Sequence, residues 1–478
     1  MAKSIDDGAY YEDDEHKDTK DLLEQQPIEK KSKLIPFACI ALFIIALVAR
    51  LYFLLIASNP DNPGAGWFGD SYHHWQIGYL TKEIGFSQGF LRVWDLKGMD
   101  LFWGLLHPLV LAFTFMLTGN DSMALARAIT CIAGAFSVVL MFLLGIKYWN
   151  WKVGLSAALM TALCSIIIFN DATGMVEPLG IPFLLAGVYF WNKKALLAGL
   201  MLGIAMLTRS EYWIYSGGLI VAFTLFDRKV STDKKVLLWL GFAIVLIPYM
   251  KYLLDYTANP IYPFYQNFFK NIAGEWQFKK VLDAADITGQ FTFRIILAIT
   301  LFFTSVVLLK RPKGWQFHLL GLGNWLFLGL TFGVSNYIKS WADYVWVVRF
   351  MLFPYTYLIM VIAVALFYTL PSILKFLKNP VFTSISFVGV AGMIAISQLA
   401  WTEIYKYYEP TNATWKSVQE ITVELIKPYQ KNGKILIAEG NPDFIDLAYV
   451  IEKNVASKKM KWSQGYFGWM KFTVVPEA

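Results

Sequence analysis

Charged residues and cysteines are both scarce in this chain of 478 residues. Asp, Glu, Lys and Arg make up 16% of it, whereas a soluble protein carries about 25%. The three cysteines, Cys39, Cys131 and Cys164, fall singly within apolar stretches, so they form neither a disulfide framework nor a CxxC metal motif. No cleavable signal peptide is expected at the N-terminus. These absences exclude an ordinary soluble enzyme and a disulfide-rich secreted domain.

Hydrophobic residues make up 56% of the chain, and its mean hydropathy is +0.47. Apolar stretches of about 15–25 residues recur from residue 34 to residue 400, which predicts an all-α polytopic membrane protein. The net charge of +7 indicates no nucleic-acid partner, because most Lys and Arg lie in short loops. The eleven predicted spans are 34–57, 122–146, 153–170, 178–191, 195–208, 212–226, 236–255, 291–309, 316–333, 346–369 and 380–400.

The basic loops predict the orientation of the chain. If residues 101–118 (LFWGLLHPLVLAFTFMLT) lie at the outer interface, five loops with 13 Lys and Arg face the cytoplasm, and the short outer loops carry only Arg209 and Lys339. A full crossing by 101–118 would reverse this asymmetry and oppose the positive-inside rule. His107 and Pro108 within the segment also favour an interfacial helix. The sequence thus predicts a plasma-membrane protein with a cytoplasmic N-terminus and an extracytoplasmic C-terminus.

Three domains are expected. Residues 1–33 are polar and rich in both charges, which predicts a disordered cytoplasmic tail. Residues 34–400 form the transmembrane domain, and residues 401–478 form a small extracytoplasmic α/β domain. Within the latter, TWKSVQEITVELIKPYQKNG (414–433) predicts an amphipathic helix, KILIAEG (434–440) a strand and PDFIDLAYVIEK (442–453) a second helix.

The first predicted outer loop holds an acid and two histidines in GDSYHHWQIGYLTKEIGF (69–86). Asp70 precedes a helix predicted over 72–86, so it can cap that helix or act as a functional acid. The acids and arginines of the other outer loops favour the functional interpretation. His73 and His74 diverge by about 100° on a helix, so they do not bind one metal together. Packing is their expected role, and a divalent-ion site of Asp70 with His74 is the alternative.

Further polar residues interrupt apolar segments at the same predicted side. Asp171 and Glu177 lie in NDATGMVEP (170–178), where Glu177 can stabilise a helix N-terminus or serve function. Arg209 and Glu211 interrupt the apolar run 195–226, and Arg349 lies just inside the end of another span. A charge at the bilayer centre costs about 2.5–3.5 kcal/mol on insertion scales. Such residues from three spans therefore indicate a shared, water-filled outer cavity.

At these residues the sequence resembles the GT-C superfamily of integral-membrane glycosyltransferases, especially relatives of protein O-mannosyltransferases and lipid A aminoarabinose transferases. The resemblance covers roughly residues 35–370. It is carried by GDSYHHWQIGYLTKEIGF, FWGLLHPLVLAFTFMLTG, LARAITCIAGAFSVVLMFLLGIKYWNWKVGLSAALM, GMVEPLGIPFLLAGVYF, LLAGLMLGIAMLTRSEYW and RFMLFPYTYLIM, in this order and sidedness. Asp70-Ser71 stands where protein O-mannosyltransferases carry Asp-Glu, and the Trp-Trp-Asp-Tyr-Gly motif of oligosaccharyltransferases is absent.

This resemblance implies juxtamembrane helices in the first outer loop and an inverting, mannosyltransferase-like hexosyltransferase. Its donor would be a polyprenyl-phosphate monosaccharide, and its acceptor a hydroxyl of a protein, lipid or glycan. Asp70 would be the general base, and Arg209 and Arg349 would bind the donor phosphate. Further candidates for the phosphate are Arg92, Lys97 and Lys339. Residues predicted to contact sugar or acceptor are Asp171, Glu177, Glu211, His73, His74 and His107, where Asp171 and Glu177 can instead hold the arginines.

No cofactor is required if arginines supply the positive charge, and a divalent metal is the alternative. Two other functions stay open: a flippase or transporter of lipid-linked sugars, and oligosaccharyltransferase-like en bloc transfer. A transporter should show internal repeats and broken helices at the midplane, and no repeat is seen in the sequence. A membrane scaffold or receptor would not need acids and arginines in four outer loops.

Overall fold

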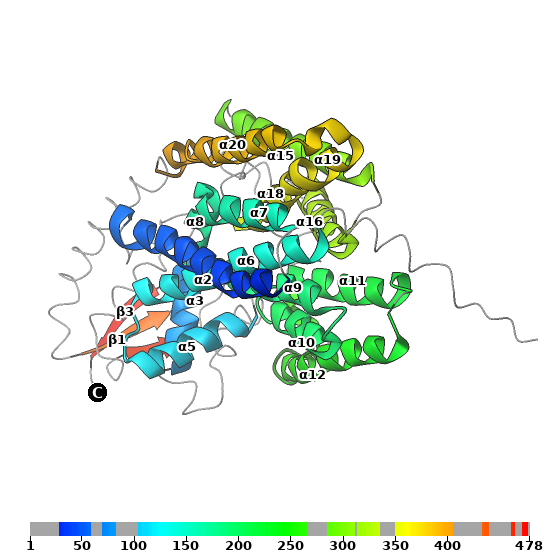
Figure 1. Ribbon diagram of the computed structural model, residues 1–478. Helices are drawn as coiled ribbons and strands as arrows, with labels where there is room; N and C mark the ends of the chain where they lie inside the picture. The colour runs from blue at the N-terminus through cyan, green and yellow to red at the C-terminus, as the bar shows by residue number, and fades with distance from the viewer. Residues whose placement is uncertain are drawn as a thin grey trace, which may run out of the picture.

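The computed structural model is a bundle of apolar helices (Figure 1). It describes residues 28–58, 69–82, 104–228, 230–265, 284–310, 313–334 and 349–405, together with three strands near the C-terminus. Five of the described helices are long and apolar enough to cross a membrane, and a bent helix pair would make a sixth. The chain is therefore a multi-pass membrane protein.

Each predicted span coincides with helical structure. The first part of the chain forms α2 (Ile28–Tyr52), the π-helical η1 (Phe53–Ala57), α3 (Gly69–Leu80), α5 (Leu106–Thr118), α6 (Met123–Tyr148), α7 (Trp151–Leu163), α8 (Ser165–Asp171) and α9 (Glu177–Phe190). The second part forms α10 (Ala195–Met206), α11 (Glu211–Phe226), α12 (Thr232–Thr257), α13 (Tyr262–Phe264), α15 (Ala284–Leu308), α16 (Trp315–Val334), η6 (Arg349–Met351), α18 (Leu352–Val364), η7 (Ala365–Thr369), α19 (Leu370–Ile373), η8 (Lys375–Lys378) and α20 (Pro380–Ser397). Several helices are too short to cross alone, and the count of eleven spans stays a prediction.

Segment 101–118 contains a helix that is too short to cross a bilayer. Its helix α5 has 13 residues, which span about 20 Å at 1.5 Å per residue. A bilayer core is about 30 Å thick. Gly119 ends the helix in the left-handed conformation with φ +65°, the usual helix-ending role of glycine. The length of α5 suits the predicted interfacial placement.

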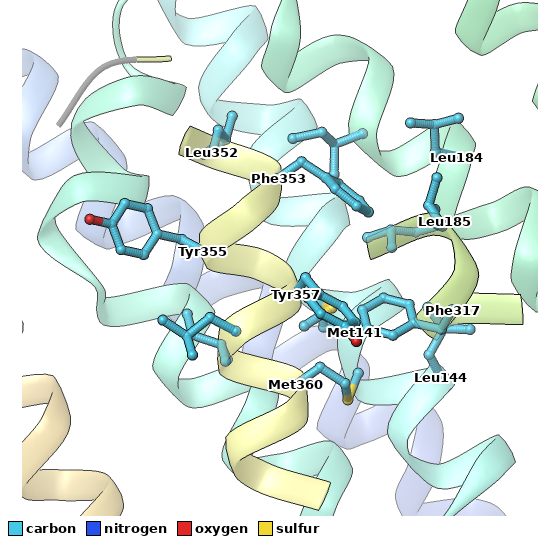
Figure 2. Packing of buried hydrophobic residues seen from close by; sticks show 14 of the residues in the cluster. Met141, Leu144, Leu184, Leu185, Phe317, Leu352, Phe353, Tyr355, Tyr357 and Met360 are labelled. Carbon is cyan, nitrogen blue, oxygen red and sulfur yellow. The ribbon is translucent and has the colours of Figure 1, made fainter. Parts of the chain in front are cut away.

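Helix α18 is the centre of the bundle. Every residue from Leu352 to Val364 is buried, as expected for a helix that is apolar on all sides. Figure 2 shows that Tyr355 and Tyr357 leave this helix on opposite sides. Its labelled neighbours come from α6, α9 and α16: Met141, Leu144, Leu184, Leu185 and Phe317.

The three strands form one sheet in the order β2-β1-β3. Strand β1 (Gly433–Ala438) pairs in parallel with β2 (Met460–Ser463) and antiparallel with β3 (Lys471–Pro476). Strand β1 lies where KILIAEG predicts a strand. The helices predicted at 414–433 and 442–453 lie outside the described residues.

The five basic loops gather at one end of the bundle, which we call the basic end. Lys147 donates to the carbonyl of Tyr189 and Lys234 to that of Asn192. Asn150 donates to the carbonyl of Phe367, and Lys313 lies over the ring of Tyr368. The predicted inner loops thus share one end, and which side of the membrane that end faces stays a prediction.

Candidate active site

Two arginines and two glutamates meet at the other end of the bundle. Arg209 lies in the turn between α10 and α11, and its Nε and Nη2 atoms donate to the two carboxylate oxygens of Glu211 at 2.8 and 2.5 Å. Its Nη1 atom lies 2.5 Å from Oε1 of Glu177, the first residue of α9. Nε of Arg349 lies 3.3 Å from the same oxygen. We call these four residues the arginine–glutamate cluster, in which Glu177 bridges the two arginines.

The cluster is buried and its formal charges balance. The side chains of Arg209 and Arg349 are each 7% exposed, Glu177 is 6% exposed and Glu211 is 16% exposed. The guanidinium carbons of the arginines lie 5.6 and 5.1 Å from the ring centre of Phe350, within cation–π range. Buried charges need pairing of this kind. The arginines predicted to bind one phosphate are thus brought together, and each of them contacts a carboxylate.

The start of α5 is fixed to the turn that carries Arg209. The backbone N–H of Leu106 donates to the carbonyl of Leu207 at 2.8 Å. Gly104 has φ +113°, and a Cβ there would lie 2.4 Å from the same carbonyl oxygen. Only glycine allows this close approach. The segment predicted as an interfacial helix therefore begins beside the arginine–glutamate cluster.

A second buried ion pair joins Arg50 at the end of α2 to Asp171 at the end of α8. Nη2 and Oδ2 are 2.7 Å apart, with the side chains 0% and 3% exposed. Arg50 also donates to the carbonyls of Ala162 and Thr161 at 3.2 and 3.4 Å, just before the chain bends by 63° into α8. Within a membrane the carbonyls freed by such a bend need partners. Asp171 thus holds an arginine, and its contact with a sugar stays a prediction.

Arg127 of α6 holds the loop between α8 and α9. Its Nε atom donates to the carbonyl of Ala172 at 2.5 Å, and its Nη2 atom to Oγ of Ser58 at 3.3 Å. Gly174 in this loop has φ +80°, and a Cβ there would lie 3.2 Å from Cγ of Arg127. Arg127 therefore fixes the backbone that leads into Glu177.

The same loop passes close to the start of α3. A Cβ on Gly174 would lie 3.8 Å from Cβ of Ser71, and Sδ of Met175 lies 3.6 Å from Nη1 of Arg349. Two consecutive loop residues thus lie between the arginine–glutamate cluster and the first turn of α3. That turn contains Asp70, because α3 begins at Gly69 rather than at the predicted residue 72.

His74 and His107 pack together where α3 meets α5. Their rings are 5.4 Å apart at 67°, and each residue is 1% exposed. Gly78 of the same interface would place a Cβ 2.7 Å from Cβ of Leu111. Among the described residues, no group of three or more His, Cys, Asp or Glu could hold a metal ion. His74 thus packs against His107, and a divalent-ion site of Asp70 with His74 stays a prediction.

Several predicted site residues lie outside the described part of the chain. These are Arg92, Lys97 and Lys339, together with the side chains of Asp70 and His73. Their predicted roles stand as predictions.

Sequence reasoning missed Arg50, Arg127 and Phe350. Arg50 carried a usable signal, because it is a charge within the predicted span 34–57 and such charges are costly. Arg127 carried the same signal five residues into the span 122–146. Phe350 carried none, because one more aromatic in an apolar stretch predicts only packing.

No protein-family model and no curated protein matches the chain. Among solved structures it is similar to the archaeal oligosaccharyltransferase AglB from Archaeoglobus fulgidus, in complex with an inhibitory peptide and a dolichol-phosphate. The identity is 14% and the TM-score 0.43 over 82% of this chain and 59% of AglB. It is also similar to ArnT from Cupriavidus metallidurans bound to undecaprenyl phosphate, with 11% identity and a TM-score of 0.47 over 89% of this chain and 75% of ArnT.

A further structure of the Archaeoglobus enzyme, tethered with an acceptor peptide containing the NVT sequon, gives 12% identity and a TM-score of 0.47 over 81% of this chain and 57% of that one. The chain thus spans less than two thirds of the length of the oligosaccharyltransferase.

Proposed function

We propose that the protein is an inverting glycosyltransferase that moves a monosaccharide from a polyprenyl-phosphate donor to an acceptor hydroxyl at the extracytoplasmic side. One observation carries this proposal. Two buried arginines converge on Glu177, and the loop residues Gly174 and Met175 lie between this cluster and the helical turn that contains Asp70. Cations for a leaving phosphate and a general base for an attacking hydroxyl are the two kinds of group that such a transfer needs.

In the proposed reaction the acceptor oxygen attacks the anomeric carbon while Asp70 takes the hydroxyl proton. The bond between the anomeric carbon and the phosphate oxygen breaks, and polyprenyl phosphate leaves from the opposite face, so the configuration inverts. The charge that grows on the phosphate is stabilised by Arg209 and Arg349, which suit phosphate because their planar forks donate two parallel hydrogen bonds. The polyprenyl tail lies between the helices, in the bilayer.

The test incubates purified protein with polyprenyl-phosphate hexoses and a range of hydroxyl acceptors, and measures release of polyprenyl phosphate. We expect release that depends on both donor and acceptor. A pyrophosphate-linked oligosaccharide serves as the second donor, and its consumption in place of the monosaccharide would support en bloc transfer. Movement of the lipid-linked sugar across vesicles without hydrolysis or transfer would support a flippase and contradict the proposal.

A further inference from the structure

The charge balance of the arginine–glutamate cluster places a condition on phosphate binding. Glu177 and Glu211 already neutralise Arg209 and Arg349, so an arriving phosphate would give this buried site a net negative charge. Uncompensated charge in a buried site is strongly unfavourable. Among the described residues, movement of one of the two carboxylates away from the cluster would restore the charge balance when a phosphate enters.

The two carboxylates differ in the number of arginines with which they form ion pairs and in how exposed their side chains are. Glu177 contacts both arginines through Oε1, its side chain is 6% exposed, and its carbonyl accepts a hydrogen bond from the hydroxyl of Tyr212 at 3.3 Å. Removing it would leave two buried arginines without their shared partner. Glu177 is thus fixed in the cluster.

Glu211 forms an ion pair with Arg209 and accepts a hydrogen bond from the Ser210 hydroxyl at 3.3 Å, and its side chain is 16% exposed. It is the first residue of α11, a helix of 16 residues. A carboxylate at a helix N-terminus is stabilised by the helix dipole. Glu211 therefore keeps a favourable partner after it leaves Arg209 and turns towards water.

Glu211 also covers the part of Arg209 that suits a phosphate. It occupies Nε and Nη2, the two donors that lie side by side on the guanidinium fork. Carboxylates and phosphates compete for this fork because both accept two parallel N–H bonds. We propose that Glu211 holds the place of the donor phosphate on Arg209 and is displaced when the phosphate binds. This inference rests on the proposed function, which supplies both the phosphate at Arg209 and its polyprenyl carrier.

The test measures equilibrium binding of farnesyl phosphate and of inorganic phosphate by the purified full-length protein, with farnesol as the control ligand. Glu211→Gln removes the competing charge, and Glu211→Asp keeps the charge but shortens the side chain so that it no longer reaches the fork. We expect both variants to bind farnesyl phosphate about 10-fold more tightly or better, since a hydrogen bond to a charged group is worth roughly 10- to 100-fold. Asp255→Asn is the matched control, because Asp255 is an exposed carboxylate paired with Lys251, and its binding should stay within about 2-fold, as for surface pairs.

Two results would overturn the proposal. If neither Glu211 variant binds phosphate more tightly, Glu211 does not compete for the fork. If Glu211→Gln binds more tightly while Glu211→Asp matches the unaltered protein, the effect is one of charge alone and no displacement occurs. A gain for inorganic phosphate alone supports the place-holding role but contradicts a lipid as its source. Because this readout is binding, absence of sugar transfer by the unaltered protein would contradict the proposed function and leave the displacement standing.

Discussion

At the basic end of the bundle lysines meet carbonyl oxygens and aromatic rings, whereas at the other end arginines meet carboxylates. Lys234 is exposed and donates to the carbonyl of Asn192. Arg209 is buried and its donors face two glutamates. Lysine is a strongly hydrated point charge on a flexible stem, while arginine is a rigid planar fork that tolerates burial. The lysines of the basic end therefore supply positive charge, which is what orientation in the membrane requires. The arginines of the other end supply hydrogen-bond donors in a fixed geometry, which is what binding and chemistry require.

The largest effect should come from breaking the ion pair of Arg50 and Asp171. Asp171→Asn leaves a buried cation without its carboxylate, which we expect to lower the free energy of unfolding by about 3–5 kcal/mol. At the basic end, Asp227 accepts a hydrogen bond from the indole of Trp191, and Asp227→Asn should cost only about 1 kcal/mol, because the amide oxygen can still accept this bond without the charge. Denaturant titration in detergent measures both.

A double variant sharpens this comparison. Arg50→Met with Asp171→Leu removes both charges, and apolar replacements of a buried pair are often tolerated. We expect it to recover much of the stability lost in Asp171→Asn. Equal losses in the single and double variants would show that the ion pair does not brace the bend between α7 and α8.

An exchange of cation type at each end should give the next largest effect. Arg209→Lys keeps the charge but loses the fork, so we expect donor turnover to fall by about 10- to 100-fold, the worth of a hydrogen bond to a charged group. Lys234→Arg at the basic end should leave turnover within about 2-fold, as for exposed charges. Similar turnover in both variants would mean that Arg209 acts only as a charge.

Two glycine substitutions test how tightly the buried end is packed. A Cβ on Gly134 would lie 2.1 Å from Oδ2 of Asp171, whereas Gly389 has nothing within 4 Å. Gly134→Ala should therefore destabilise the protein by about 1–3 kcal/mol, while Gly389→Ala should be neutral or stabilise by up to about 1 kcal/mol. Thermal unfolding in detergent compares the two, and equal stabilities would contradict the tight packing around Asp171.

The smallest functional effect should come from a labelling experiment on the two ends. The two variants are Lys193→Cys and Asn120→Cys. Position 193 lies at the basic end and position 120 at the other end, and both are exposed. We expect an impermeant thiol reagent added to intact cells to label position 120 and not position 193. The reverse pattern would overturn the orientation that the positive-inside rule predicts.

Helices and their turns follow from the sequence because local signals fix them. Ser122 and Asn150 cap α6 and α7 with their side-chain oxygens, and Gly119 ends α5, as short polar and glycine residues between apolar runs predict. The grouping of the basic loops at one end follows from their charge. These features need no knowledge of which helices touch.

The pairing of the buried charges could not be predicted in the same way. Arg50 and Asp171 are 121 residues apart, and nothing local connects them. The sequence marked Arg209, Arg349 and Glu177 as unusual. It did not predict that Glu177 bridges the two arginines or that Glu211 occupies the guanidinium fork of Arg209. Which acid pairs with which arginine depends on how α2, α6, α8 and α9 pack. The pattern of apolar residues in the sequence does not determine that packing.

Transfer by an Asp70→Asn variant is the measurement that tests the central claim most directly. Because a neutral asparagine in the first turn of α3 loses only a helix-dipole interaction worth about 0.3–1 kcal/mol, the variant should fold, express and bind donor like the unaltered protein. It cannot take a proton from a hydroxyl, and loss of a general base costs about 10²–10⁴-fold in rate. We predict release of polyprenyl phosphate at least ~100-fold slower than by the unaltered protein, within that range. Near-normal release by a well-folded Asp70→Asn protein would contradict the account and reduce Asp70 to a stabiliser of α3.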